Sequence, residues 1–158
     1  YLFNQKFMQN IIEAKELLMK NWEKGVECPC CEQFVKLYKR KLNSGMAITL
    51  VRIYKNSLTN NNDWLHVKNF LRENRFSNSH DWTLLKYWGL LEEKAVVKGE
   101  PNSGYWRITP KGEHFVLNSF EVPEAIYMFN QNLYKYSTDT TNIIESLGKK
   151  FNYHELIN

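Results

Sequence analysis

The chain has 158 residues, of which 43% are apolar and 15% aromatic, so it is long enough to bury a core and does not have the composition of a disordered protein. Its net charge is a mild +4, no apolar run approaches the roughly eighteen residues of a membrane span, and the polar start at Asn4, Gln5 and Lys6 is not that of a signal peptide. The three cysteines all lie between positions 28 and 31, which argues against a disulfide framework and predicts a reducing, cytoplasmic setting.

The first predicted element is an amphipathic helix over residues 3–24. Its apolar positions recur every three or four residues and Gly25 follows as a stop; they are Phe7, Ile11, Ala14, Leu18 and Trp22. An apolar helix face needs a surface to cover it. That surface is either the domain's own core or a second copy of the chain, so a homodimer formed through this helix is one of two interpretations.

Basic residues concentrate in the next part of the chain. Between positions 34 and 62 there is no acidic residue, and the basic residues are Lys36, Lys39, Arg40, Lys41, Arg52 and Lys55. Such a block favours a polyanion or an acidic partner. The alternative is an ordinary solvated helix face and loop.

The middle of the chain predicts alternating helices and short strands. We expect a helix over 46–55 capped by Asn43 or Ser44, a short strand over 64–67, and a helix over 66–74. A third helix over 80–88, capped by the segment 77–79, would bury Leu84, Leu85 and Trp88. Strands over 90–97 and 105–108 flank a turn over 98–104, and Thr109 followed by Pro110 begins another helix.

The remaining residues predict a small β-hairpin and short helices. Strands over 125–129 and 133–136 flank the turn formers Asn130, Gln131 and Asn132. A short helix capped by Thr138 and Asp139 is expected to end at Gly148, and Asn152 is expected to cap a last helical turn over 153–157.

This order of elements is that of a winged helix, and two motifs strengthen the interpretation. The residues Y-W-G-L-L-E at 87–92, followed by G-Y-W-R-I-T-P-K-G at 104–112, resemble the wing of MarR- and PadR-type regulators. We therefore expect an α+β fold comprising an N-terminal helix (1–27), a Cys-bearing basic segment (28–45), a winged-helix domain (46–120) and a C-terminal hairpin and helix extension (121–158). Winged helices also serve as protein-binding modules, so the fold alone does not decide the function.

The chain also resembles a group of phage and prophage proteins of unknown role. The shared pattern C-P-x-C-x-x-F-V-K-L-Y-K-R-K-L-N-S-G-M is matched from Cys28 to Met46, and a pattern V-P…Y…L-G-K-K-F-x-Y-x-E-L is matched from Val122 to Leu156. The resemblance covers residues 28–158. It implies a phage origin, and with it the cytoplasm of a host cell, but no catalytic residues.

Cys28 and Cys31 form a Cys-x-x-Cys pair that could present two thiolates to a structural zinc ion. Two more ligands are needed, and no histidine lies at a companion spacing, so a second chain would have to supply its own pair. The alternative is free thiols. No phosphate-binding loop, G-x-S-x-G or H-E-x-x-H motif is present, and we expect no enzyme.

For a DNA-binding winged helix, the third helix enters the major groove and the wing contacts the backbone. The candidate contacts are Ser79, His80, Thr83 and Lys86 on the helix, Lys98 and Arg107 on the wing, and Lys36, Lys39, Arg40 and Lys41 for phosphates. Double-stranded DNA is accordingly the first expected partner, and a role in transcription regulation follows. Asp81 and the single lysine of the helix weaken this interpretation. The alternative is an interaction protein that inhibits a host nucleic-acid-binding protein, such as a defence nuclease.

Overall fold

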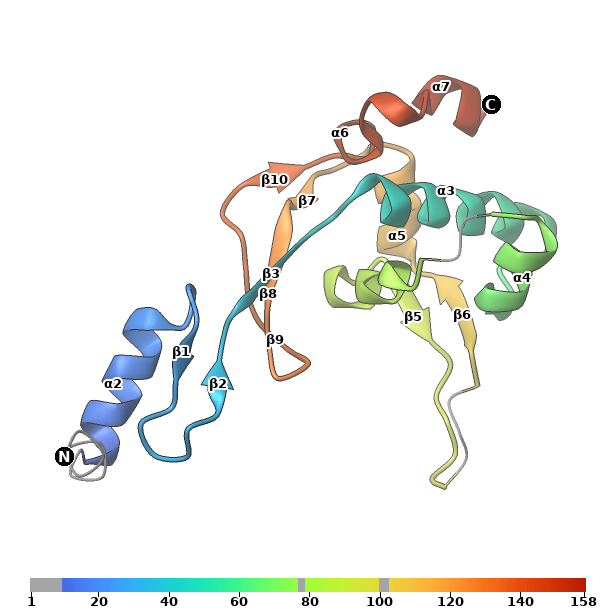
Figure 1. Ribbon diagram of the computed structural model, residues 1–158. Coiled ribbons are helices and arrows are strands. Elements are labelled where there is room, and N and C mark those ends of the chain that lie inside the picture. The colour runs from blue at the N-terminus through green and yellow to red at the C-terminus, as the bar shows by residue number, and fades with distance from the viewer. Residues whose placement is uncertain (1–9, 77–78, 100–102) are drawn as a thin grey trace. The chain divides into compact units, whose positions relative to one another are not determined.

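The computed structural model describes residues 10–76, 79–99 and 103–158. The described chain divides into two compact units. The first unit comprises residues up to Arg40 together with Ile126–Lys135, and the second comprises Lys41–Ala125 and Tyr136–Asn158. The structure is a mixed α+β fold with several small sheets (Figure 1). Several expected features lie outside the described residues: the start of the first helix, with Phe3 and Phe7, the capping residues Ser77 and Asn78, and part of the turn over 98–104.

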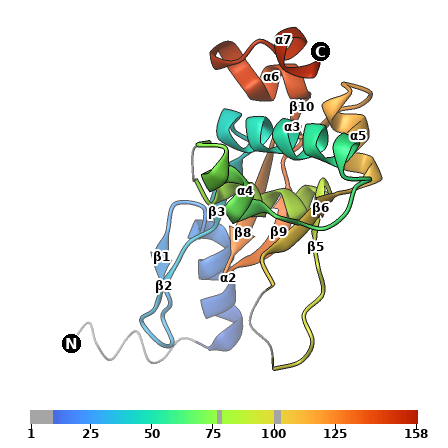
Figure 2. The same cartoon turned by 90° about the vertical axis from the view of Figure 1, so that its right-hand side faces the viewer.

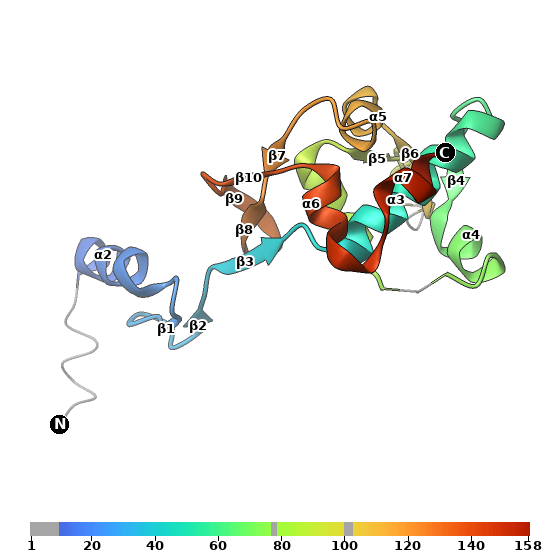
Figure 3. The same ribbon diagram turned by 90° about the horizontal axis from the view of Figure 1, so that it is seen from above.

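The first unit begins with helix α2 (Ile11–Asn21), which is capped by the side chain of Asn10. Strands β1 (Val26–Glu27) and β2 (Phe34–Val35) then form an antiparallel pair. Strand β3 (Tyr38–Lys41) joins β8 (Ala125–Phe129) and β9 (Asn132–Tyr136) in a sheet of order β3-β8-β9, seen from above in Figure 3. The sequence pattern did not predict β1, β2 or β3.

The hairpin of β8 and β9 is confirmed, with a tighter turn than expected. Asn130 and Gln131 both have positive φ angles, 48° and 62°, and only these two residues separate the strands. Two successive positive φ values are those of a type I′ turn, whose twist matches that of the paired strands. Within this unit the ring of Trp22 packs on Tyr134 and Phe129, with centroids 4.7 and 5.6 Å apart.

Helix α3 (Ser44–Thr59) is the centre of the second unit. The side chain of Asn43 accepts the N–H of Met46 at 2.9 Å, so the expected cap is confirmed. Around α3 pack η1 (Asp81–Trp88), α5 (Pro110–Val116), α6 (Ile143–Leu147) and α7 (Tyr153–Ile157). Figures 1 and 2 show α6 and α7 on one side of α3 and the hairpin of β5 and β6 on the other.

The second sheet has the strand order β4-β6-β5 and is antiparallel throughout. Its strands are β4 (Leu65–His66), β6 (Tyr105–Ile108) and β5 (Leu91–Glu93), and helix α4 (Val67–Glu73) follows β4 directly. The expected pairing of residues near 91 with those near 108 is therefore present, although β5 stops at Glu93 rather than at Val97. Strands β7 (Val122–Pro123) and β10 (Thr140–Thr141) form a further short pair that the sequence did not predict.

The junction between β6 and α5 explains the I-T-P-K-G motif. Thr109 accepts the N–H of Gly112 at 3.0 Å and donates its hydroxyl to the carbonyl of Gly89 at 2.6 Å. A Cβ atom at Gly112 would lie 2.2 Å from the carbonyl oxygen of Leu90, so only glycine lets the two backbones approach. The predicted cap at Thr109 is confirmed. The predicted cap at Thr138 and Asp139 is wrong, because Asn142 caps α6 instead.

The third helix is where the structure departs most from expectation. Residues 81–88 form the 3₁₀ helix η1 and not an α-helix, and the residues buried on it are Trp82, Leu85 and Trp88. Leu84, which an α-helical pattern would bury, is only half-buried. A 3₁₀ helix has three residues per turn, so residues three apart lie on one line along it. The buried tryptophans and leucine occupy one such line.

Among the described residues, no helix is both long and apolar enough to cross a membrane.

Two leucines on α3 provide a test of this core. Leu50 is fully buried and Leu58, two turns later, is 65% exposed. We expect Leu50→Ala to lower the free energy of unfolding by about 2–5 kcal/mol, because it removes buried methyl groups and leaves a cavity. Leu58→Ala should change it by no more than about 0.5 kcal/mol. Chemical denaturation followed by circular dichroism measures both, and equal losses would contradict the placement of α3.

Candidate nucleic-acid interface and cysteine turn

The outward line of η1 carries three of the residues that the sequence singled out. Thr83 and Lys86 on η1 and His80, the residue directly before it, are spaced by three, so the 3₁₀ winding brings them to one edge, beside the buried line of Trp82, Leu85 and Trp88. The hydroxyl of Thr83 donates to the carbonyl of His80 at 2.9 Å and is left with acceptor capacity toward solvent. This edge borders an open groove of about 460 Å³, which we call the η1 groove; its lining residues are His66, Lys68, His80, Trp82, Thr83, Lys86, Glu93, Gly104 and Trp106.

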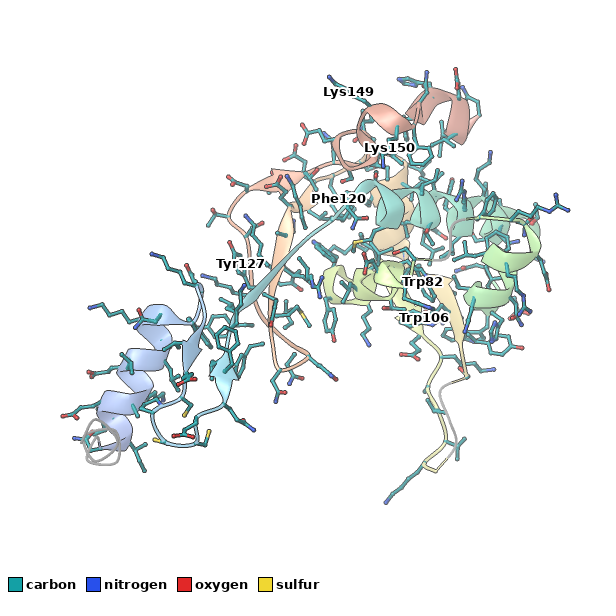
Figure 4. The ribbon with its side chains drawn as sticks, viewed as in Figure 1. Trp82, Trp106, Phe120, Tyr127, Lys149 and Lys150 are labelled. Atoms are coloured by element: carbon teal, nitrogen blue, oxygen red, sulfur yellow. The ribbon has the colours of Figure 1, made fainter. Side chains whose placement is uncertain are left out.

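Two tryptophans form the wall of the η1 groove. The rings of Trp82 and Trp106 meet edge to face, with centroids 5.1 Å apart and planes at 80° (Figure 4). The Lys86 ammonium lies 5.9 Å from the centre of the Trp106 ring, within the range of a cation–π contact. The indole Nε1 of Trp82 is buried and has no hydrogen-bond partner among the described residues. The wall therefore consists of two packed indole rings.

The opposite side of the η1 groove comes from β4 and the start of α4. His66 accepts the N–H of Asn69 through Nδ1 at 3.3 Å and its ring packs edge to face on Tyr105 at 5.2 Å. Gly104 has a φ of 72°, and a Cβ there would lie 2.7 Å from Nε2 of His66. Glycine at position 104 therefore suits both the positive φ and the close approach of the His66 ring.

The charges in the η1 groove are mixed, with a small positive excess. Lys68 and Lys86 are exposed cations, and Glu93 is the acidic residue of the lining. Asp81 is exposed in the first turn of η1. The lining therefore has a formal charge of +1 from two lysines and one glutamate.

Arg107 and Lys98 are not part of the η1 groove. Arg107 is ion-paired with Glu92 and its guanidinium stacks over Trp64, 4.2 Å from the ring centre. Since side chains alternate along a strand, Arg107 faces away from its groove-lining neighbour Trp106. Lys98 is exposed in the turn after β5. Ser79 is exposed just before η1, and its hydroxyl accepts the N–H of Asp81 at 3.4 Å.

The basic segment is divided between the two units. In the first unit, the ammonium of Lys36 lies 5.6 Å from the Tyr38 ring centre, that of Lys39 lies 5.9 Å from the Tyr127 ring centre, and Arg40 is exposed. Lys41 is the first residue of the second unit. It is paired with Glu124 at 2.6 Å, and the hydrogen bond and charge of that carboxylate raise the pKa of Lys41.

Sequence reasoning missed His66, Lys68 and Trp106 as members of the η1 groove. They reach it because β4 pairs with β6, with His66 opposite Tyr105 and Leu65 opposite Trp106. Forty residues separate these partners, and no local pattern encodes that register. The one available signal was Gly104, a glycine placed directly before a strand.

The cysteines lie on the turn between β1 and β2. The N–H of Cys28 donates to the carbonyl of Gln33 at 2.8 Å, and the N–H of Glu32 donates to the carbonyl of Cys28 at 2.9 Å, which closes the turn. All three thiols are free, and Cys30 and Cys31 are exposed. The backbone N–H groups of Cys31 and then Cys30 donate to the sulfur of Cys28 and lower its pKa. Desolvation, followed by the charge of Cys28, raises the pKa of Cys30.

These thiols do not assemble a complete metal site within one chain. Across residues 10–76, 79–99 and 103–158, no group of three or more His, Cys, Asp or Glu side chains is placed to hold a metal ion. The expected pair, Cys28 and Cys31, consists of two free thiols on a turn closed by backbone hydrogen bonds.

Comparison with protein-family models, with curated proteins and with solved structures finds no match to this chain.

The opposite pKa directions of Cys28 and Cys30 predict different reactivity with pH. Cys28 should ionise at a lower pH than Cys30, because its thiolate accepts two backbone N–H groups and the Cys30 thiolate is disfavoured by desolvation. Alkylation rates with iodoacetamide should rise at lower pH in a Cys30→Ser, Cys31→Ser variant than in a Cys28→Ser, Cys31→Ser variant. Coincident or reversed profiles would show that the backbone donors do not face Cys28.

Proposed function

We propose that residues 44–116 form a winged helix that binds double-stranded DNA through the outward edge of η1. The element order α3-β4-α4-η1-β5-β6-α5 and the strand order β4-β6-β5 support this proposal. The observation that carries it is the alignment of Thr83 and Lys86 on η1 with His80, the residue directly before it, along one edge beside the buried line. An aligned row of polar side chains on a short, firmly packed helix is what a groove-reading element needs.

The dimensions of this edge suit the major groove. A 3₁₀ helix rises about 2 Å per residue, so the edge from His80 to Lys86 extends about 12 Å, close to the width of the major groove. In this arrangement His80 and Thr83 contact base edges, and Lys86 and Lys68 contact phosphates. Phosphate contacts from few cations give modest, salt-sensitive affinity.

Two further features support a dimeric DNA-binding regulator: a basic strand that suits phosphates and a helix face that suits a second copy. Arg40 and Lys39 lie on the exposed strand β3 and add phosphate contacts that do not depend on sequence. Helix α2 exposes Ile11, Ile12 and Met19, and covering this face with a second copy provides the homodimer that binding two half-sites requires.

The loop after β5 favours a second candidate function. Val96 and Val97 are exposed there, the latter by 69%. Exposed apolar side chains suit a protein surface better than a phosphate backbone. The second candidate is therefore an interaction protein of the phage type that docks on a host nucleic-acid-binding protein and inhibits it.

Charge reversal in the η1 groove tests the first candidate. We expect Lys68→Glu with Lys86→Glu to lower the affinity for a random-sequence duplex at least about tenfold, and to reduce the slope of log affinity against log salt by about two, because two phosphate contacts are lost. Fluorescence anisotropy over a salt series measures both quantities.

Lys149→Glu with Lys150→Glu is the matched control. It changes the net charge by the same amount, and Figure 4 shows both lysines well away from Trp82 and Trp106. Its affinity should stay within about twofold of the unmodified protein's. Equal losses in the two variants would assign the binding to net charge alone. If the unmodified protein fails to bind duplex at low salt but retains a host protein in a pulldown, the second candidate replaces the first.

The basic strand gives an independent prediction. Lys39→Glu with Arg40→Glu should abolish duplex binding and leave the melting temperature unchanged, because both side chains are exposed and contact phosphates in the proposed complex. An electrophoretic shift assay and a thermal melt measure these two properties. Unchanged affinity would remove the phosphate role of β3.

A further inference from the structure

The turn that carries the cysteines is closed before any ligand arrives. Val26 and Glu27 pair with Val35 and Phe34, and the two backbone hydrogen bonds of Cys28 continue this pairing into the turn. Pro29 is buried and fixes the chain direction between Cys28 and Cys30. Cys28 and Cys31 are therefore held together on a pre-formed hairpin tip and not on a loose segment.

The spacing and accessibility of the pair suit a metal ion. Cys28 and Cys31 are separated by two residues, the spacing with which one turn presents two thiolates to one zinc ion. Neither thiol is in a disulfide, Cys31 is exposed and Cys28 is half-buried. Both sulfurs are therefore available to a ligand.

One chain supplies too few ligands. A structural zinc ion takes four ligands in a tetrahedron, and the described residues bring no third metal-ligating side chain to the pair in a suitable arrangement. The remaining two ligands must come from elsewhere.

The same unit exposes an apolar face that fits a second copy of itself. On α2, Ile11 is 81%, Ile12 70% and Met19 50% exposed. Lys15, Glu16 and Lys20 border these residues and carry both signs of charge, so two such helices running antiparallel can pair opposite charges around an apolar centre. A second copy therefore has a surface to occupy in the unit that holds the cysteines.

We propose that Cys28 and Cys31 of two chains together bind one zinc ion in a tetrahedral site of four thiolates, which links two copies of the protein through their first units. The site takes a thiophilic divalent ion, since four sulfur ligands in a tetrahedron select zinc over hard cations. On binding, each thiol that is still protonated releases its proton to solvent, so the four thiols of two chains release up to four protons. Four thiolates around one zinc ion give the site a net charge of −2. Cys30 is not a ligand.

Cobalt(II) titration of the reduced protein, made metal-free first, tests the proposal. Cobalt replaces zinc in such sites and absorbs visibly when its site is tetrahedral. We expect the visible absorption of a tetrahedral cobalt–thiolate site, which should reach its maximum at half a cobalt ion per chain. Added zinc should displace the cobalt and remove this absorption. Light scattering should show the mass doubling from 18.9 kDa as the site fills.

Serine variants identify the ligands. Cys28→Ser and Cys31→Ser should each lose both the tetrahedral spectrum and the metal-dependent mass doubling, and Cys30→Ser should keep both. Circular dichroism verifies that each variant is folded. Saturation at one ion per chain with an unchanged mass, absence of a tetrahedral spectrum, or loss of the site in Cys30→Ser would each overturn the proposal. None of these readouts involves DNA, so the outcome is independent of the function proposed for the second unit.

Discussion

The three-residue period of η1 determines which of its side chains are buried and which border the η1 groove. Trp82, Leu85 and Trp88 are all buried, and they lie in line only if the helix is wound with three residues per turn. The indole of Trp88 donates to the carbonyl of Pro123 at 2.7 Å and ties this line to the chain beyond α5. In an α-helix, residues three apart turn away from one another by about 60° per step, and the polar residues between them would spread over a third of the circumference. Because the buried residues lie in line along η1, the polar residues between them are also brought into line and form the polar edge.

Elements whose signals are local could be predicted from the sequence. Asn43 and Thr109 are side-chain caps that act within three residues, so the caps of α3 and α5 were correctly predicted, although α3 extends beyond the expected 46–55 at both ends. The β8–β9 hairpin followed from its turn residues in the same way. The winding of η1 could not be predicted, because it is imposed by tryptophans that pack against distant parts of the chain. Strands of two to four residues such as β1 and β3 are too short to show an alternating pattern.

In the candidate site too, some residues could be predicted from local sequence and others are brought in by long-range strand pairing. His80, Thr83 and Lys86 were identified because they lie on one short helix. Lys68 and Trp106 join them through the pairing of β4 with β6, which is a long-range contact. Arg107 has the right charge in the right strand, but its ion pair with Glu92 and its stacking on Trp64 engage it in holding the sheet together. Whether a charged side chain is available to bind a ligand depends on its neighbours in the fold, and the sequence alone does not show them.

Nuclear magnetic resonance of the labelled protein, titrated with a random-sequence duplex at low salt, locates the surface that binds DNA. We expect the amide shifts to concentrate at His80, Thr83 and Lys86, together with the indole signal of Trp106, and the amide signals of α6 and α7 to keep their positions. Shifts centred on the loop after β5, or no shifts at all, would rule out the η1 edge as the DNA-binding surface.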